Sequence, residues 1–131
     1  MLKNQLQSIV LIVVVILFII SLVSGVSTGV ADAQARLTYQ NASNIAQAIN
    51  YFYKDQNLYP STDQFYNQGI LVPYYLAAVP KPAAASGGCK AYTDFAYTET
   101  DLKTFKLTFC LGRSVGNLPA GVHSFTEKGL Q

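Results

Sequence analysis

The sequence predicts an α+β protein in which a long N-terminal helix precedes, and packs against, a small antiparallel β-sheet. Three observations lead to this fold class. No ionisable side chain occurs between Lys3 and Asp32 of the 131-residue chain. A helical pattern without proline or glycine then runs from Val30 to Tyr53. The rest of the chain holds turn residues, alternating apolar strands and both cysteines. We therefore divide the chain into a hydrophobic helix (1–30), its amphipathic continuation (31–53) and a globular head (54–131).

The composition excludes several classes of protein. With 50% hydrophobic and 12% charged residues, the chain is too apolar to be intrinsically disordered. Nine basic side chains stand against seven acidic ones, a formal net charge of +2. That balance argues against a dedicated nucleic-acid-binding protein, which normally carries a clustered basic face. One histidine and two cysteines give little material for a zinc site or a catalytic triad.

The most apolar segment, Ile9–Val23, is interrupted only by Ser21. About 20 apolar residues in a helix cross the ~30 Å hydrocarbon layer of a bilayer. The β-branched run within this segment is expected to be helical, because a backbone in lipid must satisfy its own hydrogen bonds. The segment therefore predicts a membrane span.

Three interpretations of this span are open. It is a cleaved secretory signal, with Ala31-Asp-Ala33 as the small-residue cleavage site. It is a plain single-pass anchor, with Lys3 on the cytoplasmic side. Or it is an anchor that also serves as an assembly surface. The length of the apolar stretch favours the two anchor interpretations over the signal.

The helix is expected to continue beyond the span. Apolar residues recur at helical spacing, and polar, mostly uncharged residues lie between them. This stripe predicts the face that packs on the head: Val30, Ala33, Leu37, Ile45, Ile49 and Phe52. Gly25 and Gly29 lie between the span and its continuation. They predict either a flexible step in the helix or close packing between helices, where glycine is well tolerated.

The head predicts an antiparallel meander. Alternation is clearest in Thr104–Leu111, where Phe105, Leu107, Phe109 and Leu111 share one face. Strands are also expected at Ala91–Tyr97 and Val122–Thr126, with a turn at Glu99–Lys103 between the first two. A short helix or irregular turn is expected within Phe65–Leu76.

Cys89 and Cys110 bracket the first predicted hairpin. A disulfide closing a loop of about 22 residues would stabilise a small head by roughly 3 kcal/mol. It would also place the head in an oxidising compartment. The alternatives are two unrelated buried thiols, or a metal site, for which His123 is the only imidazole in the chain.

Chemistry-bearing residues do not form a recognisable catalytic pattern. His123 lies within a predicted strand and is interpreted as structural. Asp94, Glu99 and Asp101 are too sparse for a calcium loop and fit a solvated turn better. Asn41-Ala-Ser43 matches a glycosylation sequon but falls in the middle of a predicted helix. We predict no catalytic residue, no metal site and no cofactor.

Several stretches, in the same order along the chain, resemble the type IV pilins and the pseudopilins of type II secretion. The residues that carry the resemblance are Ala31-Asp-Ala-Gln-Ala-Arg36, Ala48–Pro60, Leu71–Pro80, Phe105–Gly112 and Ala120–His123. The resemblance covers nearly the whole chain, although each motif is loose. It implies the pilin fold, in which a long helix packs against a disulfide-bonded sheet. It also implies a structural subunit rather than an enzyme.

In that family, helices of this kind form the core of a helical filament. The resemblance implies filament-core roles here for Met1, Gln5, Gln7, Ile9, Val13, Val14, Ile16, Phe18 and Ile20. One departure is that Gln5 stands where the family usually has a glutamate that neutralises a neighbouring subunit's amine; Gln7 is the candidate in a shifted register. The proline usual in the middle of the span is also missing.

The expected partners are identical copies of the chain and, before assembly, the cytoplasmic membrane and pilus assembly machinery. No nucleic-acid site is expected. The expected location is a filament on the cell surface. The alternative is a monomeric, single-pass anchored protein whose extracytoplasmic head binds a partner or ligand.

Overall fold

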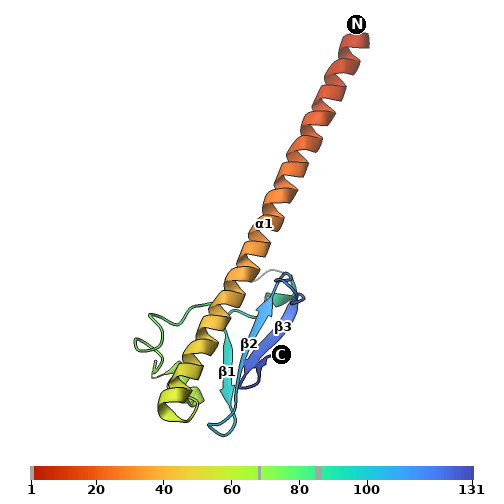
Figure 1. Ribbon diagram of the computed structural model, residues 1–131. Coiled ribbons are helices and arrows are strands. Elements are labelled where there is room, and N and C mark those ends of the chain that lie inside the picture. Colours follow the sequence, from red (N-terminus) through yellow and green to blue (C-terminus); the bar gives the residue numbers. More distant parts are fainter. Residues whose placement is uncertain (1, 68, 85–86) are drawn as a thin grey trace. The chain divides into compact units, whose positions relative to one another are not determined.

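The computed structural model of the chain describes residues 2–67, 69–84 and 87–131 (Figure 1). The chain divides into a first compact unit, which ends at Ala31, and a second, Asp32–Gln131. The long N-terminal helix and the small antiparallel sheet expected from the sequence are both present. The elements are α1 (Leu2–Gln56), α2 (Thr62–Tyr66), the 3₁₀ turn η1 (Gly87–Cys89), β1 (Ala96–Glu99), β2 (Phe105–Leu111), β3 (Gly121–Thr126) and β4 (Gly129–Leu130).

Helix α1 extends past the expected end at Tyr53 to Gln56. It stops because Asn57 adopts a left-handed conformation with φ of 57°. In that position the N–H of Asn57 donates to the carbonyl of Tyr53 at 2.7 Å. Asparagine is one of the few residues besides glycine that enters this conformation readily, so it is a suitable helix terminator.

The four strands form an antiparallel meander in the order β1-β2-β3-β4. The predicted alternation in β2 is confirmed, because Phe105, Leu107, Phe109 and Leu111 are all buried. The prediction for β3 is also confirmed to within one residue. Strand β4 was not predicted, since two residues are too few to show an alternating pattern.

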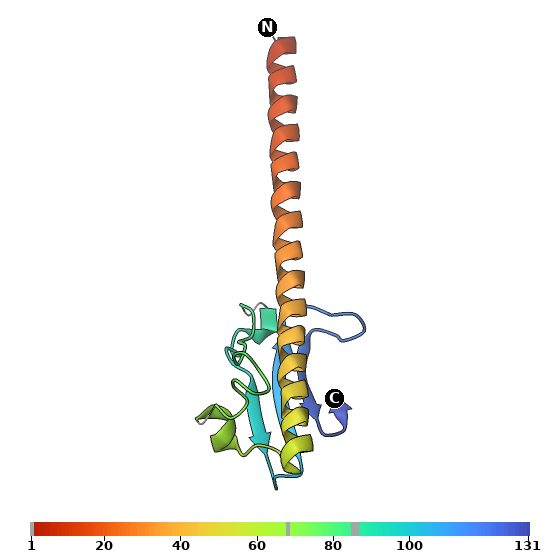
Figure 2. The ribbon, with the colours of Figure 1, turned by 60° about the vertical axis from the view of Figure 1, so that its left-hand side comes forward.

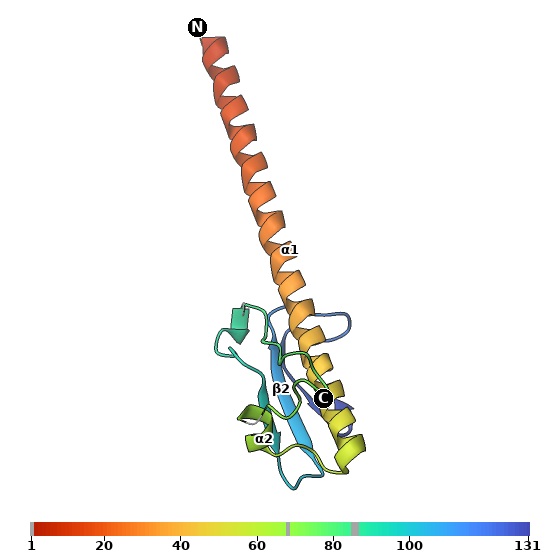
Figure 3. The ribbon, with the colours of Figure 1, turned by 90° about the vertical axis from the view of Figure 1, so that its left-hand side faces the viewer.

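Strand β1 begins at Ala96 rather than at the expected Ala91. The residues before it form a turn that follows η1, in which the N–H of Tyr92 donates to the carbonyl of Cys89 at 2.8 Å. This turn satisfies the backbone locally, so the aromatic run of 91–95 does not join the sheet. The expected helix within 65–76 is also displaced, because α2 starts at Thr62 (Figure 3). Ser61 and Gln64 form a capping box at its start.

The face of α1 that packs on the sheet differs in part from the predicted stripe. Ile45, Ile49 and Phe52 are buried as expected. The N-terminal part was wrong, because Val30, Ala33 and Leu37 are exposed. Small side chains such as Ala35, Thr38 and Ala42 are buried there instead. The C-terminal half of α1 runs alongside the sheet (Figure 2). The buried residues of α1 are Ala35, Thr38, Ala42, Ile45, Ala46, Ala48, Ile49 and Phe52.

Tyr97 is the largest fully buried side chain of the core. Its ring stacks on Phe65 at 4.3 Å between centroids. Its hydroxyl donates to the carbonyl of Pro60 at 2.6 Å, so the polar end of the ring is satisfied inside the core. Burial raises the pKa of Tyr97 above the usual value for tyrosine.

The outer edge of β1 is covered by a side chain. The backbone N–H of Tyr97 donates to the hydroxyl of Tyr66 at 2.6 Å, and this hydroxyl lies 3.3 Å from the carbonyl of Phe95. Unpaired edge strands are sites of unwanted strand pairing. Helix α2 therefore closes this edge with one tyrosine.

Candidate membrane-spanning and assembly segment

The apolar segment of the first unit is exposed on every side of the helix. From Ile9 to Leu22 each large apolar side chain has between 49% and 68% of its surface exposed. Successive helical residues are rotated by about 100°, so an unbroken apolar run leaves no polar face. A helix that is apolar all round is normally covered by lipid or by other protein.

The residues predicted to form a filament core lie on this surface where the structure describes them. Gln7 and the six apolar positions Ile9, Val13, Val14, Ile16, Phe18 and Ile20 are all exposed in α1. Met1 lies outside the described residues. Gln5 belongs to α1, but its side chain is also outside the described part of the structure.

By length and composition, α1 is able to cross a membrane. Its most apolar 18-residue window has a mean hydropathy of 3.3, and none of that window is buried within the chain. This exposure distinguishes it from the core helix of a soluble domain. A signal sequence near an N-terminus meets the same criteria of length and hydropathy, so these properties indicate membrane anchoring only in a general way.

Gly25 and Gly29 lie within unbroken α-helix. A Cβ atom added at either position would meet nothing within 4 Å. The Thr28 hydroxyl donates to the carbonyl of Gly25 at 2.9 Å, a side-chain contact that competes for helix carbonyls and often accompanies bends. The fold of the single chain therefore does not require glycine at these two positions.

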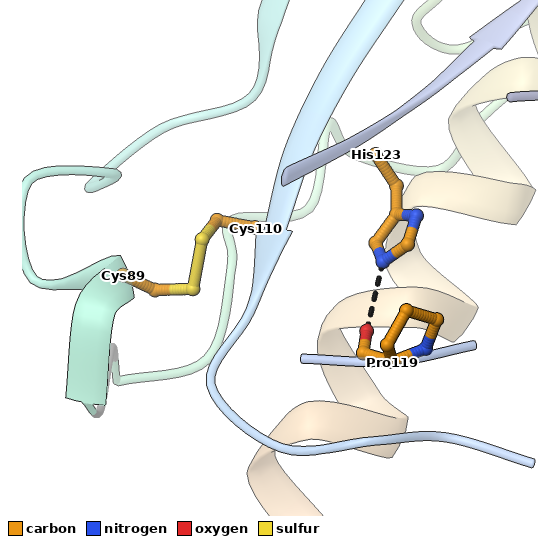
Figure 4. The surroundings of a disulfide bond; sticks show 4 residues. All are labelled: Cys89, Cys110, Pro119 and His123. Atoms are coloured by element: carbon orange, nitrogen blue, oxygen red, sulfur yellow. Dashed lines mark hydrogen bonds between the residues drawn. A yellow bond between two sulfur atoms is a disulfide. The ribbon is translucent and has the colours of Figure 1, made fainter. Parts of the chain in front are cut away.

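Cys89 and Cys110 form the expected disulfide, with Cα atoms 5.5 Å apart (Figure 4). Cys110 lies in β2, and Cys89 ends η1 rather than starting a strand. The bond thus fastens an irregular segment to the centre of the sheet.

His123 lies in β3, as predicted, and its Nε2 is 2.9 Å from the carbonyl of Pro119 (Figure 4). An imidazole N–H in that position closes the loop before the strand. Its ring also lies 5.8 Å from that of Phe109, between centroids. These contacts fit the structural role expected for this histidine.

All three acids near the first hairpin accept hydrogen bonds from groups of the chain, and Asp94 accepts from the Thr93 hydroxyl at 3.3 Å. Glu99 accepts from the N–H and the hydroxyl of Thr62, at 3.0 and 2.7 Å. These hydrogen bonds hold the pKa of Glu99 below its usual value. Asp101 accepts from Thr104 and Lys103, which lowers its pKa in the same way. Within residues 2–67, 69–84 and 87–131, no three metal-ligating side chains come together.

The sequon asparagine is engaged within the head. The side-chain nitrogen of Asn41, the atom to which a glycan would be attached, donates to the carbonyl of Lys81 at 3.0 Å. The neighbouring Thr38 hydroxyl accepts from the N–H of Ala83 at 3.0 Å. Both contacts fasten the segment around Pro82 to α1.

A groove at the C-terminal end of α1 was not predicted from the sequence. Its lining comes from α1, α2 and the turn that contains Tyr74. Three separate segments contribute one or a few residues each, so no periodic or spaced pattern marks them. The only sequence signal is an excess of tyrosine, which is scattered along the head.

Comparison with known proteins returns no significant match to a protein-family model, a curated protein or a solved structure. The function is therefore inferred from the residues of this chain.

Proposed function

We propose that the chain is the structural subunit of an extracellular helical filament of the type IV pilin kind. Before assembly, the apolar half of α1 anchors each copy in the cytoplasmic membrane, where assembly machinery extracts it. In the filament, the same segments bundle with one another and the heads form the outer shell. The subunit has no catalytic role, and pseudopilus and pilus filaments are variants of the same proposal.

The observation that carries the proposal is the all-round exposure of the apolar segment from Ile9 to Leu22. Covering a valine, leucine, isoleucine or phenylalanine side chain fully is worth about 1.5–3 kcal/mol. Lipid supplies that cover for a single anchored copy. Outside lipid, only other apolar surfaces supply it, and repeated contacts between different faces of identical copies generate an open helical polymer.

The head contributes the second line of support. Together with the part of α1 that belongs to the second unit, it forms a core that includes Ile49, Leu107 and Phe109, and it holds a disulfide. It is therefore suited to an oxidising space outside the cytoplasm. The sequence resemblance to pilins covers both the N-terminal helix and the head, and it is the third line of support.

Gln5 has a specific role in this proposal. Its amide oxygen accepts a hydrogen bond from the terminal amine of a neighbouring copy. The bond is weaker than that of a carboxylate because it lacks charge assistance. Gln5→Glu is expected to speed assembly if this contact forms.

Electron microscopy of material sheared from cells and kept free of detergent tests the proposal. We expect thin filaments of uniform width that contain this chain. Val14→Lys should abolish them, because a charge at the centre of such a helix costs about 2.5–3.5 kcal/mol even on insertion scales. Asn117→Lys, which adds the same charge in an exposed loop, is the matched control and should leave filaments intact.

Two results would count against the filament. One is assembly that persists in Val14→Lys. The other is a chain that is found only as detergent-dependent monomers, which would support the anchored protein with a ligand-binding head.

A further inference from the structure

A groove lies at the C-terminal end of α1, in the second unit. It consists of two adjoining cavities of about 490 and 390 Å³ that share Phe52, Gln56 and Gln64 in their lining. Asp55, Tyr74 and Tyr75 line the larger cavity as well. We call this surface the α1-end groove. Phe52 is buried, whereas Gln56 is exposed and Gln64 is half-buried.

Two tyrosine rings border the α1-end groove, one packed against the core and the other exposed. Tyr75 packs edge-on against Phe52, with ring centroids 5.8 Å apart. Tyr74 has 86% of its surface exposed, more than any other large hydrophobic side chain described as exposed. Its backbone is nevertheless held, because the N–H groups of Tyr75 and Leu76 both donate to the carbonyl of Leu71, at 2.9 and 2.8 Å. Leu71 itself is buried in the core.

A tyrosine on an anchored turn loses little conformational freedom when a ligand covers its ring. Isolated exposed apolar side chains are common and need no special role. Tyr74 differs because it stands beside a groove and on a turn that is closed by the hydrogen bonds from Tyr75 and Leu76 to Leu71. It is therefore a ready stacking surface.

Polar side chains of the α1-end groove are held by hydrogen bonds within the chain but keep further donor and acceptor atoms for a ligand. The carboxylate of Asp55 accepts from the Tyr75 hydroxyl through Oδ2, at 2.7 Å. The amide oxygen of Gln64 accepts from the N–H of Ser61 at 2.9 Å. Among the residues that the structure describes, no hydrogen bond within the chain occupies Asp55 Oδ1, Gln64 Nε2 or the amide of Gln56. The groove thus offers both donors and acceptors on planar groups.

The charge of the lining selects the class of ligand. Asp55 is the only charged residue among the described residues that line the two cavities, and no cation lines them. A carboxylate without a neighbouring cation disfavours phosphate, nucleic acid and sialylated or sulfated ligands. What remains is a neutral molecule with many groups that both donate and accept hydrogen bonds, and with an apolar face for an aromatic ring.

We propose that the α1-end groove binds a neutral saccharide. Sugar hydroxyls pair with the Asp55 carboxylate and the amides of Gln56 and Gln64, and the C–H face of a pyranose ring lies on Tyr74. A few placed polar groups within an otherwise apolar lining are typical of small-ligand sites. The proposal uses only residues of the second unit and does not depend on filament formation.

The test uses the full chain, dispersed in a detergent without a sugar headgroup, on an array of neutral, sialylated and sulfated oligosaccharides. We expect binding to neutral glycans, and weakening of about tenfold in Tyr74→Ala, since a tenfold change corresponds to the loss of one good aromatic contact. Tyr51→Ala is the matched control. Tyr51 is an exposed tyrosine of α1 that does not line the groove, so this variant should bind as well as the parent chain.

A second variant, Gln56→Ala, is expected to weaken binding to the same glycans without changing the near-ultraviolet circular dichroism of the head. The proposal is wrong if no neutral glycan binds, if the sialylated or sulfated glycans bind better, or if Tyr51→Ala loses as much binding as Tyr74→Ala. Because the chain is dispersed, failure of filaments to form would leave this result unaffected, and loss of glycan binding would not argue against filaments.

Discussion

The two units of the chain differ in whether they expose or bury their apolar side chains. From Ile9 to Leu22, large apolar side chains are exposed all round the helix. Between Asp32 and Gln131, the same kinds of side chain form a core, in which Ile45, Ile49 and Leu107 have no exposed surface. One helix, α1, contributes to both units.

The difference shows which part of the chain buries its own apolar groups and satisfies its own polar groups. The head satisfies its apolar groups through its sheet and its polar groups through contacts such as Tyr97 to Pro60. The first unit has nothing of its own to cover it. A helix with such a surface is normally covered by lipid or by other protein, which the single chain does not provide.

The largest effect on stability is expected from truncation of the buried face of α1. Ile49→Ala should destabilise the head by about 2–5 kcal/mol, because it removes a fully buried side chain and leaves a cavity. Leu37→Ala, on the exposed side of the same helix, should change stability by less than about 0.5 kcal/mol. Urea unfolding of the full chain in micelles, followed by near-ultraviolet circular dichroism, measures both. Equal losses in the two variants would mean that α1 packs on the sheet through another face.

Removal of the disulfide should have the next largest effect. The double variant Cys89→Ser/Cys110→Ser is expected to lose about 3 kcal/mol of head stability, mainly through the larger entropy of the unfolded chain. The same unfolding measurement, compared with the parent chain in reducing and non-reducing buffer, checks this value. Membrane association of the variant should be unchanged, since the disulfide lies wholly in the second unit. Reduced membrane association in the folded variant would contradict the separation of roles between the units.

Smaller effects are expected at the glycines. Gly25→Ala and Gly29→Ala should each favour helix by up to about 1 kcal/mol and leave head stability alone, because an added Cβ meets nothing. If close approach of neighbouring helices needs these glycines, both variants should assemble fewer filaments while their membrane association persists. An undiminished filament yield in both variants would show that neighbouring helices do not need these glycines and that the helix merely tolerates them.

The smallest effect is a dependence of head stability on pH. The hydrogen bonds from Thr62 stabilise the charged form of Glu99, so its pKa is lower in the folded chain than the usual 4.5. This contribution is complete above pH 4.5 and is lost as the pH falls through the lowered value. Glu99→Gln should therefore reduce the loss of stability on acidification below that pH, in urea unfolding series at several pH values. Asp101, whose pKa is also lowered, retains its own share. An unchanged acid dependence in Glu99→Gln would show that these hydrogen bonds contribute little.

Some features were predictable because a single local pattern determines them. The alternation in β2 identifies its buried face, and the apolar run before Asp32 identifies the long helix without reference to the rest of the chain. The pairing of Cys89 with Cys110 follows from there being two cysteines near one hairpin.

Other features depend on contacts between distant segments. Leu37 is more apolar than Ala35, yet Ala35 is the one that is buried. The two residues lie on different faces of α1, and only packing against the rest of the unit decides which face is covered. The start of β1 is set by the turn after η1, and its aromatic run looks like a strand in isolation. The α1-end groove is assembled from α1, α2, the turn that contains Tyr74 and loop residues such as Leu58 and Leu102. Gln56, Gln64 and Tyr74 are therefore ordinary surface residues in the sequence and neighbours only in the fold.

Cross-linking between copies tests most directly whether other chains cover the apolar segment. A single cysteine introduced by Leu17→Cys, on the exposed surface of the first unit, would be treated with a bismaleimide linker in sheared, detergent-free material. The linker is needed because contacts between different faces do not have to bring two copies of position 17 within disulfide distance. We predict covalent dimers, because one thiol per copy forms one link, and a ladder of higher species if a second cysteine is added at Leu11. The matched variant Asn117→Cys should give far less of both. Monomers alone from Leu17→Cys would contradict the account and leave lipid as the only cover for this segment.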